Sequence, residues 1–88
     1  MSQWQVYVVR CKDDTFYTGV TTDLERRINE HNHDDRCAAS YTRGRRPVTL
    51  VYSESCASRS AALKRELGIK KLKRWQKEAL INAAAALA

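Results

Sequence analysis

Two polar side chains occupy positions in TDLERRINEH, residues 22–31, where an amphipathic helix would carry apolar residues. Arg27 and His31 join Leu24 and Ile28 in the i, i+3, i+4, i+7 spacing of one helical face. That face has to be the buried one, because the segment has no other large apolar residues. We therefore expect a fixed positive charge and a proton-exchanging imidazole at the edge of the core. The ordinary alternative is an arginine lying along apolar surface beside a hydrogen-bonded histidine.

A single carboxylate stands in the most basic part of the chain. Glu66 is the only acid in residues 55–77, and it shares a predicted helical face with Leu63, Leu67 and Lys70. A salt bridge to Lys70 is one explanation for an acid at this position. The other explanation is that the carboxylate holds a hard divalent metal ion, with water and phosphate oxygens as the remaining ligands.

Two tyrosines fall in segments that are typical of β-strands. Tyr7 lies inside the first segment, whereas Tyr17 begins the second and is followed by Thr18 and Gly19. Gly19 has no side chain, so a ligand or another backbone can approach closely there. The two phenols face the same side only if the hairpin loop has an odd length or a bulge is present. Packing is the ordinary role of either tyrosine alone.

Length and composition indicate one small domain and exclude several classes of protein. The chain has 88 residues, 43% hydrophobic and 30% charged, which is a globular and not a disordered composition. No apolar run approaches the ~18 residues that span a membrane, and the N-terminal segment lacks the pattern of a signal peptide. The three cysteines have no CxxC spacing, which argues against a disulfide framework or a zinc site. We expect one domain, residues 1–88, in the cytoplasm with access to the nucleoid, without a membrane or an obligatory protein partner.

The charge of the chain is strongly asymmetric. Residues 1–35 hold four basic and seven acidic residues, whereas residues 36–88 hold twelve basic and three acidic residues. A local excess of cations is a candidate footprint for a polyanion, and a solvated basic face is the ordinary alternative. The candidate nucleic-acid-binding residues are Arg43, Arg45, Arg46, Lys70, Lys71, Lys73 and Arg74. The sequence does not separate DNA from RNA.

The first part of the chain predicts a β-hairpin followed by a helix. Residues 4–11 and 16–20 are rich in β-branched and aromatic side chains and flank a polar turn. Thr22 and Glu25 have the spacing of a capping box, which predicts a helix that begins there and ends at about Asn32.

The second part of the chain predicts one more strand and two helices. A polar connection over residues 33–46 leads to Pro47, which opens a strand over residues 48–53. The helices cover about residues 61–71 and 74–84, and the first is capped by Ser55 or Ser58. This order of elements predicts an α+β fold in which helices pack against a small three-stranded sheet.

Several motifs in this order resemble the GIY-YIG endonuclease superfamily. Gln5-Val6-Tyr7 stands at the place of the GIY motif, and Tyr17-Thr18-Gly19 stands at the place of the YIG motif. Leu24, Arg27 and His31 follow with the spacing of the superfamily, as do residues 42–47 and 62–66. The match covers about residues 4–81 and is similar in particular to the small single-domain bacterial proteins of this superfamily.

The resemblance implies a three-stranded antiparallel sheet flanked by about three helices. It also implies catalytic roles for Tyr7, Tyr17, Arg27 and His31, and a metal-binding role for Glu66 with one Mg²⁺ or Mn²⁺ ion. Either tyrosine would orient or deprotonate the attacking water, and the sequence does not say which. Arg27 would place positive charge at the phosphate, and His31 would orient a phenol or relay a proton.

The function that the resemblance implies is metal-dependent, endonuclease-like hydrolysis of DNA phosphodiester bonds. Such an enzyme would be directed by the structure or the ends of DNA, with low sequence specificity, and would act in DNA repair or processing. The alternative is a non-catalytic nucleic-acid-binding module that keeps the fold.

Overall fold

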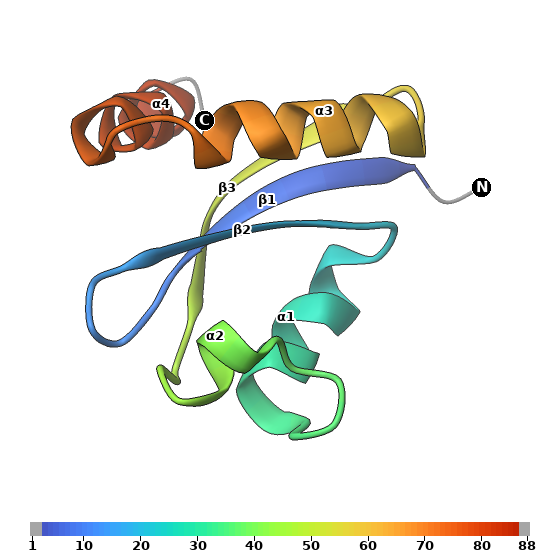
Figure 1. The fold of residues 1–88 in the computed structure, drawn as a ribbon, viewed down its shortest axis with the longest axis vertical. Helices are drawn as coiled ribbons and strands as arrows, with labels where there is room; N and C mark the ends of the chain where they lie inside the picture. Colours follow the sequence, from blue (N-terminus) through green and yellow to red (C-terminus); the bar gives the residue numbers. More distant parts are fainter. Residues whose placement is uncertain (1–2, 87–88) are drawn as a thin grey trace.

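Three strands form an antiparallel sheet that separates two pairs of helices (Figure 1). A computed structural model describes residues 3–86, so the two residues at each end of the predicted domain, 1–88, lie outside the described residues. The sheet has the order β2-β1-β3, with β1 at Trp4–Arg10, β2 at Phe16–Thr21 and β3 at Thr49–Cys56. One face carries α1 (Leu24–His33) and α2 (Ser40–Arg43), and the other carries α3 (Arg59–Lys70) and α4 (Arg74–Ala86). The predicted α+β class and the antiparallel sheet are confirmed.

The central strand, β1, supplies side chains to a core on each side of the sheet. Val6 and Val8 face α3 and α4 and are buried against residues of those helices. Tyr7 faces the opposite side, where Leu24 and Ile28 of α1 pack against its core. The predicted apolar stripe of α1 is therefore the face that contacts the sheet, and it brings the other residues of that face close to Tyr7.

The register of the hairpin places both predicted tyrosines on the α1 side of the sheet. Tyr7 pairs with Gly19 and Val9 pairs with Tyr17. Paired residues of an antiparallel sheet share a face, and so do residues two apart in one strand. The connection, residues 11–15, has an odd number of residues, so the two phenols meet without a bulge between β1 and β2.

Helix α1 begins one residue later than its sequence predicts. Asp23, and not Thr22, is the N-cap, and its carboxylate accepts the N–H of Arg26 at 3.1 Å. An ionised carboxylate is favoured at this end of a helix because it also opposes the positive end of the dipole. The predicted capping box of Thr22 and Glu25 is thus wrong, and the helix continues to His33.

The other boundaries follow from local hydrogen bonds. Strand β3 begins after Val48, whose N–H donates to the side chain of Asn32 at 2.7 Å instead of joining the ladder. Ser58, one of the two predicted caps, accepts the N–H of Ala61 at 3.1 Å and starts α3. Helix α2 interrupts the predicted polar connection over residues 33–46 and was not predicted. Within residues 3–86, no helix is both long enough and apolar enough to cross a bilayer.

The buried side of α3 is not the face that Glu66 shares with Leu63, Leu67 and Lys70. Ala62 and Ile69 are fully buried, whereas Leu67 is 57% exposed. Leu63 and Glu66 are half-buried at the edge of the contact. Ile69, and not Leu67, packs into the core, so the face shared by Leu63, Glu66, Leu67 and Lys70 lies towards the edge of the contact.

Candidate active site

A buried phenol and a buried imidazole form the centre of the site. Tyr7 Oη lies 2.7 Å from His31 Nε2, and the two residues are 1% and 0% exposed. The Tyr17 ring meets the His31 ring edge-on, with 5.4 Å between the ring centroids. Three of the four predicted catalytic residues, from β1, β2 and α1, therefore lie in contact on one side of the sheet.

Arg27 is the fourth predicted catalytic residue, and its guanidinium is held beside this group. Its Nη1 donates to the Cys37 carbonyl at 2.7 Å and to Glu30 Oε1 at 3.2 Å. The side chain is 24% exposed, so it lies at the edge of the core as its helical spacing predicts. Two fixed acceptors leave the guanidinium in one orientation, with its charge near Tyr7.

The ionisation of the phenol and the imidazole is set by burial and by arginine. Burial raises the pKa of Tyr7 to about 12, although the neighbouring Arg27 guanidinium acts to lower it. Burial lowers the pKa of His31 to about 4, and the charges of Arg27 and Arg46 act in the same direction, against Glu30. At neutral pH the pair is therefore a neutral phenol beside a neutral imidazole, the state in which a proton can pass between them.

Glu66 belongs to α3, in the layer on the other face of the sheet. Its side chain is 16% exposed, and its Oε2 lies 3.4 Å from Lys70 Nζ, the salt bridge that its spacing predicts. The negative charge of Glu66 still contributes to raising the pKa of Tyr7, as the smallest of the effects that act on it. Glu66 is therefore coupled to the phenol through its charge, and α3 packs across β1 and β2.

The single carboxylate of Glu66 is compatible with a metal ion whose other ligands are water and substrate oxygens. Within residues 3–86, no three side chains of the His, Cys, Asp and Glu types gather into a metal site. Mg²⁺ commonly binds through one or two carboxylates together with water and substrate phosphates. Glu66 supplies one such carboxylate, half-buried in a basic part of the chain.

Gly19 makes room for the phenol of Tyr7. A Cβ at this position would lie 2.5 Å from Tyr7 Oη and 2.7 Å from Tyr7 Cζ. The sequence predicts close approach of a ligand or a backbone at this glycine, and the structure places a side chain there. The glycine of the Tyr17-Thr18-Gly19 motif therefore leaves space for the ring of Tyr7 on the neighbouring strand.

Tyr17 is covered by a residue from α2. The Tyr41 ring stacks on the Tyr17 ring, with 5.9 Å between the centroids and 26° between the planes. The Arg45 guanidinium lies 4.0 Å from the Tyr41 centroid and is bonded to Asp13. Tyr41 is thus packed between the Tyr17 ring and the Arg45 guanidinium.

The arrangement of the sheet and of these residues agrees with a known family. The sequence model of the GIY-YIG catalytic domain matches residues 3–79. The chain belongs to the GIY-YIG family. Gln5-Val6-Tyr7, at the place of the GIY motif, and Tyr17-Thr18-Gly19, at the place of the YIG motif, meet in the sheet where Tyr7 pairs with Gly19.

The relatives include UPF0213 proteins of bacteria and archaea. A UPF0213 protein of Halobacterium salinarum is 59% identical over 75 residues, which are 85% of this chain and 95% of the relative. A UPF0213 protein of Desulfotalea psychrophila is 53% identical over 81 residues, 92% of this chain and 73% of the relative. The solution NMR structure of an E. faecalis protein is 42% identical, with a TM-score of 0.63 over 98% of this chain and 88% of its own. That of a Bacillus halodurans UPF0213 protein is 41% identical, with a TM-score of 0.58 over 94% of this chain and 85% of its own.

Two of the candidate nucleic-acid-binding arginines hold the GIY-YIG site together. Arg45 Nε pairs with Asp13 Oδ2 at 3.0 Å. Arg46 Nε donates to the His31 carbonyl at 2.6 Å, and its Nη1 pairs with Asp35 at 2.7 Å. Their charges are thus largely compensated within the chain, by acids from its N-terminal part.

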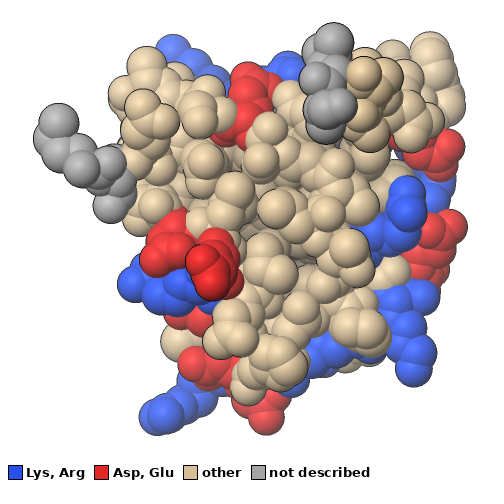
Figure 2. Space-filling model, turned by 180° about the vertical axis from the view of Figure 1, so that it is seen from behind, with Lys and Arg blue, Asp and Glu red and all other residues tan. Residues whose placement is uncertain are grey.

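The remaining candidate cations fall into two groups. Lys70 and Arg74 form ion pairs with acidic side chains. Arg43, Lys71 and Lys73 are exposed, and they form no ion pair within the part of the chain that is described. Figure 2 shows that charged groups lie around the rim of the rear face and that uncharged residues fill its centre, so the cations make no continuous patch there.

Two further residues were not singled out from the sequence. Trp75, at the start of α4, is 67% exposed. Its position beside a run of basic residues could have marked it in the sequence as a candidate nucleic-acid contact. Thr42, in α2, is fully buried with its Oγ1 2.8 Å from His31 Nδ1. The sequence signal for Thr42 is its place at the start of residues 42–47, which follow the spacing of the superfamily. The contact with His31 itself depends on the path of the chain between α1 and α2.

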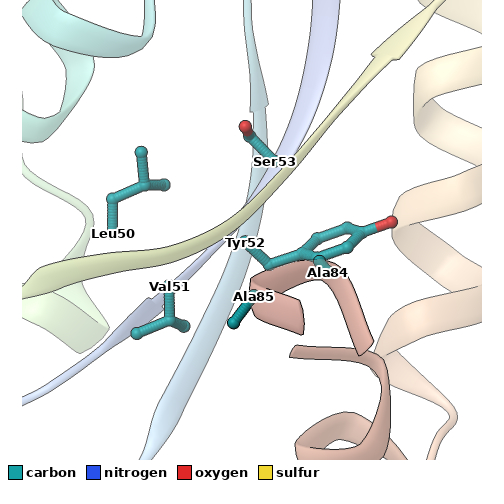
Figure 3. Close-up of a pocket in the computed structure, with 6 residues that line it drawn as sticks. All are labelled: Leu50, Val51, Tyr52, Ser53, Ala84 and Ala85. Atoms are coloured by element: carbon teal, nitrogen blue, oxygen red, sulfur yellow. The ribbon is translucent and has the colours of Figure 1, made fainter. Parts of the chain in front are cut away.

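A hollow between β3 and the end of α4 is separate from this site (Figure 3). Its lining consists of Leu50, Val51, Tyr52, Ser53, Ala84 and Ala85. The one phenol in this lining, Tyr52, donates to Glu54 at 2.6 Å. None of the predicted site residues lines this hollow, so we assign it no part in the chemistry.

Proposed function

We propose that this GIY-YIG domain hydrolyses DNA phosphodiester bonds at the group formed by Tyr7, Tyr17, Arg27 and His31, with Glu66 as the metal ligand. The observation that carries the proposal is the buried hydrogen bond between Tyr7 and His31, with the Arg27 charge beside it. Packing alone does not require a guanidinium beside a buried phenol and a buried imidazole. The family to which the chain belongs, that of a catalytic domain, supports the same conclusion.

Tyr7 is the phenol that we assign to the attacking water. It accepts a proton from the water while its own proton moves to His31 Nε2, 2.7 Å away. Arg27 holds the phosphate and stabilises the charge that develops on it. The phosphate also offsets the arginine charge, which removes one of the effects that disfavour protonated His31. Tyr17 packs against His31 and holds its ring in place.

A divalent metal ion, Mg²⁺ or Mn²⁺, would be held by Glu66 and would supply Lewis-acid stabilisation of the leaving oxygen. The exposed cations would contact phosphates, which fixes the position of DNA without reading its sequence. We therefore infer low sequence specificity, with cleavage directed by branches, nicks or ends. Repair or processing of DNA in the cytoplasm is the cellular role that this proposal implies.

Cleavage by a Glu66→Gln variant tests the proposal. We expect purified protein with Mg²⁺ or Mn²⁺ to cleave branched, nicked or single-stranded DNA. Glu66→Gln should lower the rate by about 10²-fold or more, because a catalytic metal supplies several kcal/mol of charge stabilisation. Glu78→Gln is the matched control, since Glu78 also pairs with a cation one helical turn away, Arg74, at 2.7 Å. Equal rates for the two variants would contradict the assignment of Glu66.

The second candidate function is a nucleic-acid-binding module without catalysis, and the exposure of Trp75 favours it. Trp75 lies at the corner between α3 and α4 with the exposed Lys71 and Lys73. An indole there can stack on an unpaired base while the ammonium groups contact phosphates. Under this function, Glu66→Gln would leave binding unchanged and no substrate would be cleaved.

Replacing Trp75 by alanine is expected to weaken binding of single-stranded DNA by about 5–100-fold, since one stacked base contributes ~1–3 kcal/mol. Fluorescence anisotropy of a labelled oligonucleotide, measured at several salt concentrations, gives the affinity. Leu67→Ala is the control, because Leu67 is also exposed and apolar but cannot stack. If both variants bind as tightly as the wild type, this corner is not the contact surface.

A further inference from the structure

A continuous chain of hydrogen bonds connects the candidate active site to α2. Tyr7 Oη lies 2.7 Å from His31 Nε2, His31 Nδ1 lies 2.8 Å from Thr42 Oγ1, and Thr42 Oγ1 lies 3.1 Å from the Ala39 carbonyl oxygen. The three residues come from β1, α1 and α2, and each is at most 1% exposed to solvent. Such a chain fixes the direction of every proton in it, because each group can donate only the protons that it has.

The phenol sets the first direction. Within residues 3–86, the hydrogen-bond partner of Tyr7 Oη is His31 Nε2, and the neighbouring Arg27 guanidinium can only donate. A proton on Nε2 would leave the buried phenolic proton without an acceptor, which carries the full cost of desolvation. Nε2 is therefore the acceptor, and neutral His31 carries its single ring proton on Nδ1.

Thr42 stands at the other end of this chain of hydrogen bonds, and its hydroxyl proton also needs an acceptor. The Nδ1–H donates to Thr42 Oγ1, so the hydroxyl proton has to be directed elsewhere. The carbonyl of Ala39, the N-cap residue of α2, receives it and also accepts the N–H groups of Thr42 and Arg43. The bond from Thr42 to Ala39 therefore leaves Thr42 Oγ1 free to accept from Nδ1, in agreement with the tautomer that the phenol requires.

We propose that Thr42 is a positioning residue that holds His31 in the Nδ1–H tautomer, so that Nε2 stays free to receive the Tyr7 proton. Its position is fixed by the two arginines of the connection that follows. Arg45 donates to the Tyr41 carbonyl at 2.8 Å, and Arg46 donates to the His31 carbonyl at 2.6 Å. Helix α2 is thereby tied to α1, and the catalytic consequence of this tautomer rests on the function proposed above.

The tautomer can be measured without any cleavage assay. Two-bond ¹⁵N–¹H correlation spectra distinguish the two neutral forms of a histidine, and we expect the Nδ1–H form for His31 at pH 7. Thr42→Val keeps the shape of the side chain but removes the acceptor, so it should move His31 towards the Nε2–H form. Thr42→Ser keeps the hydroxyl and should keep the wild-type form. An Nε2–H form in the wild type, or an unchanged tautomer in Thr42→Val, would overturn the proposal.

Kinetics then separate positioning from substrate binding. Thr42→Val should lower kcat by about 10²-fold, the lower end of a general acid–base contribution, with KM unchanged, and Thr42→Ser should restore most of kcat. Loss of kcat in both variants alike would assign Thr42 a packing role and contradict the proposal. If the wild type cleaves no DNA, the proposed function fails, while the spectra still decide whether Thr42 sets the tautomer.

Discussion

Replacing Gly19 by alanine is expected to destabilise the fold by about 1–3 kcal/mol and to abolish cleavage. The added Cβ would lie 2.5 Å from Tyr7 Oη. The ring cannot move aside easily, because Tyr7 is 1% exposed and its hydroxyl is bonded to His31. Either the phenol shifts and loses His31, or β1 and β2 separate where Tyr7 and Gly19 pair.

Gly68→Ala is the matched control, because it makes the same chemical change in open space. Beyond its own stretch of helix, nothing lies within 4 Å of a Cβ at Gly68, which is inside α3. Alanine there should raise stability by about 0.5–1 kcal/mol through its helix propensity. Chemical denaturation measures both variants, and a Gly19→Ala protein that is as stable and active as the wild type would contradict the packing role of Gly19.

The parts of the site that are encoded by local patterns could be predicted from the sequence. The spacing of Leu24, Arg27, Ile28 and His31 defines one face of α1, and burial of the two apolar residues carries the other two inwards. The pairing of strands with an odd connection likewise brings the two phenols to one face. These features depend on the repeat of a helix or a strand, which a single sequence shows directly.

The parts of the site that depend on the path of the chain could not be predicted. Helix α2 has four residues, too few for a periodic pattern, yet it supplies Thr42 to His31. Arg45 and Arg46 belong to a cationic run that suggested nucleic acid, and tertiary contacts join them to Asp13 and Asp35. Ion pairs within the fold therefore neutralise part of the positive charge that is concentrated in residues 36–88. Composition alone does not show this, because it contains no information about partners.

The free energy of unfolding is expected to fall by about 2 kcal/mol between pH 7 and pH 5, because His31 is buried as a neutral group. Burial and the charges of Arg27 and Arg46 lower its pKa to about 4 in the folded chain, from an ordinary value of 6.5. Between these values the unfolded chain binds a proton that the folded chain does not. Stability is therefore fully present above pH 6.5 and is lost as the pH falls towards 4.

Denaturation at a series of pH values, with two histidine variants, isolates this effect. His31→Gln should remove the slope between pH 7 and pH 5, whereas His33→Gln, which changes the exposed histidine of the same helix, should keep it. The pKa values of Asp13, Asp34 and Glu54 are also lowered in the fold, but these carboxyl groups affect stability mainly at lower pH. They therefore do not mask the change in stability between pH 7 and pH 5. A wild-type stability that is constant from pH 7 to pH 5 would mean that the pKa of His31 is the same in the folded and the unfolded chain. His31 would then gain its proton in the fold as readily as in the unfolded chain, which would contradict its burial as a neutral group.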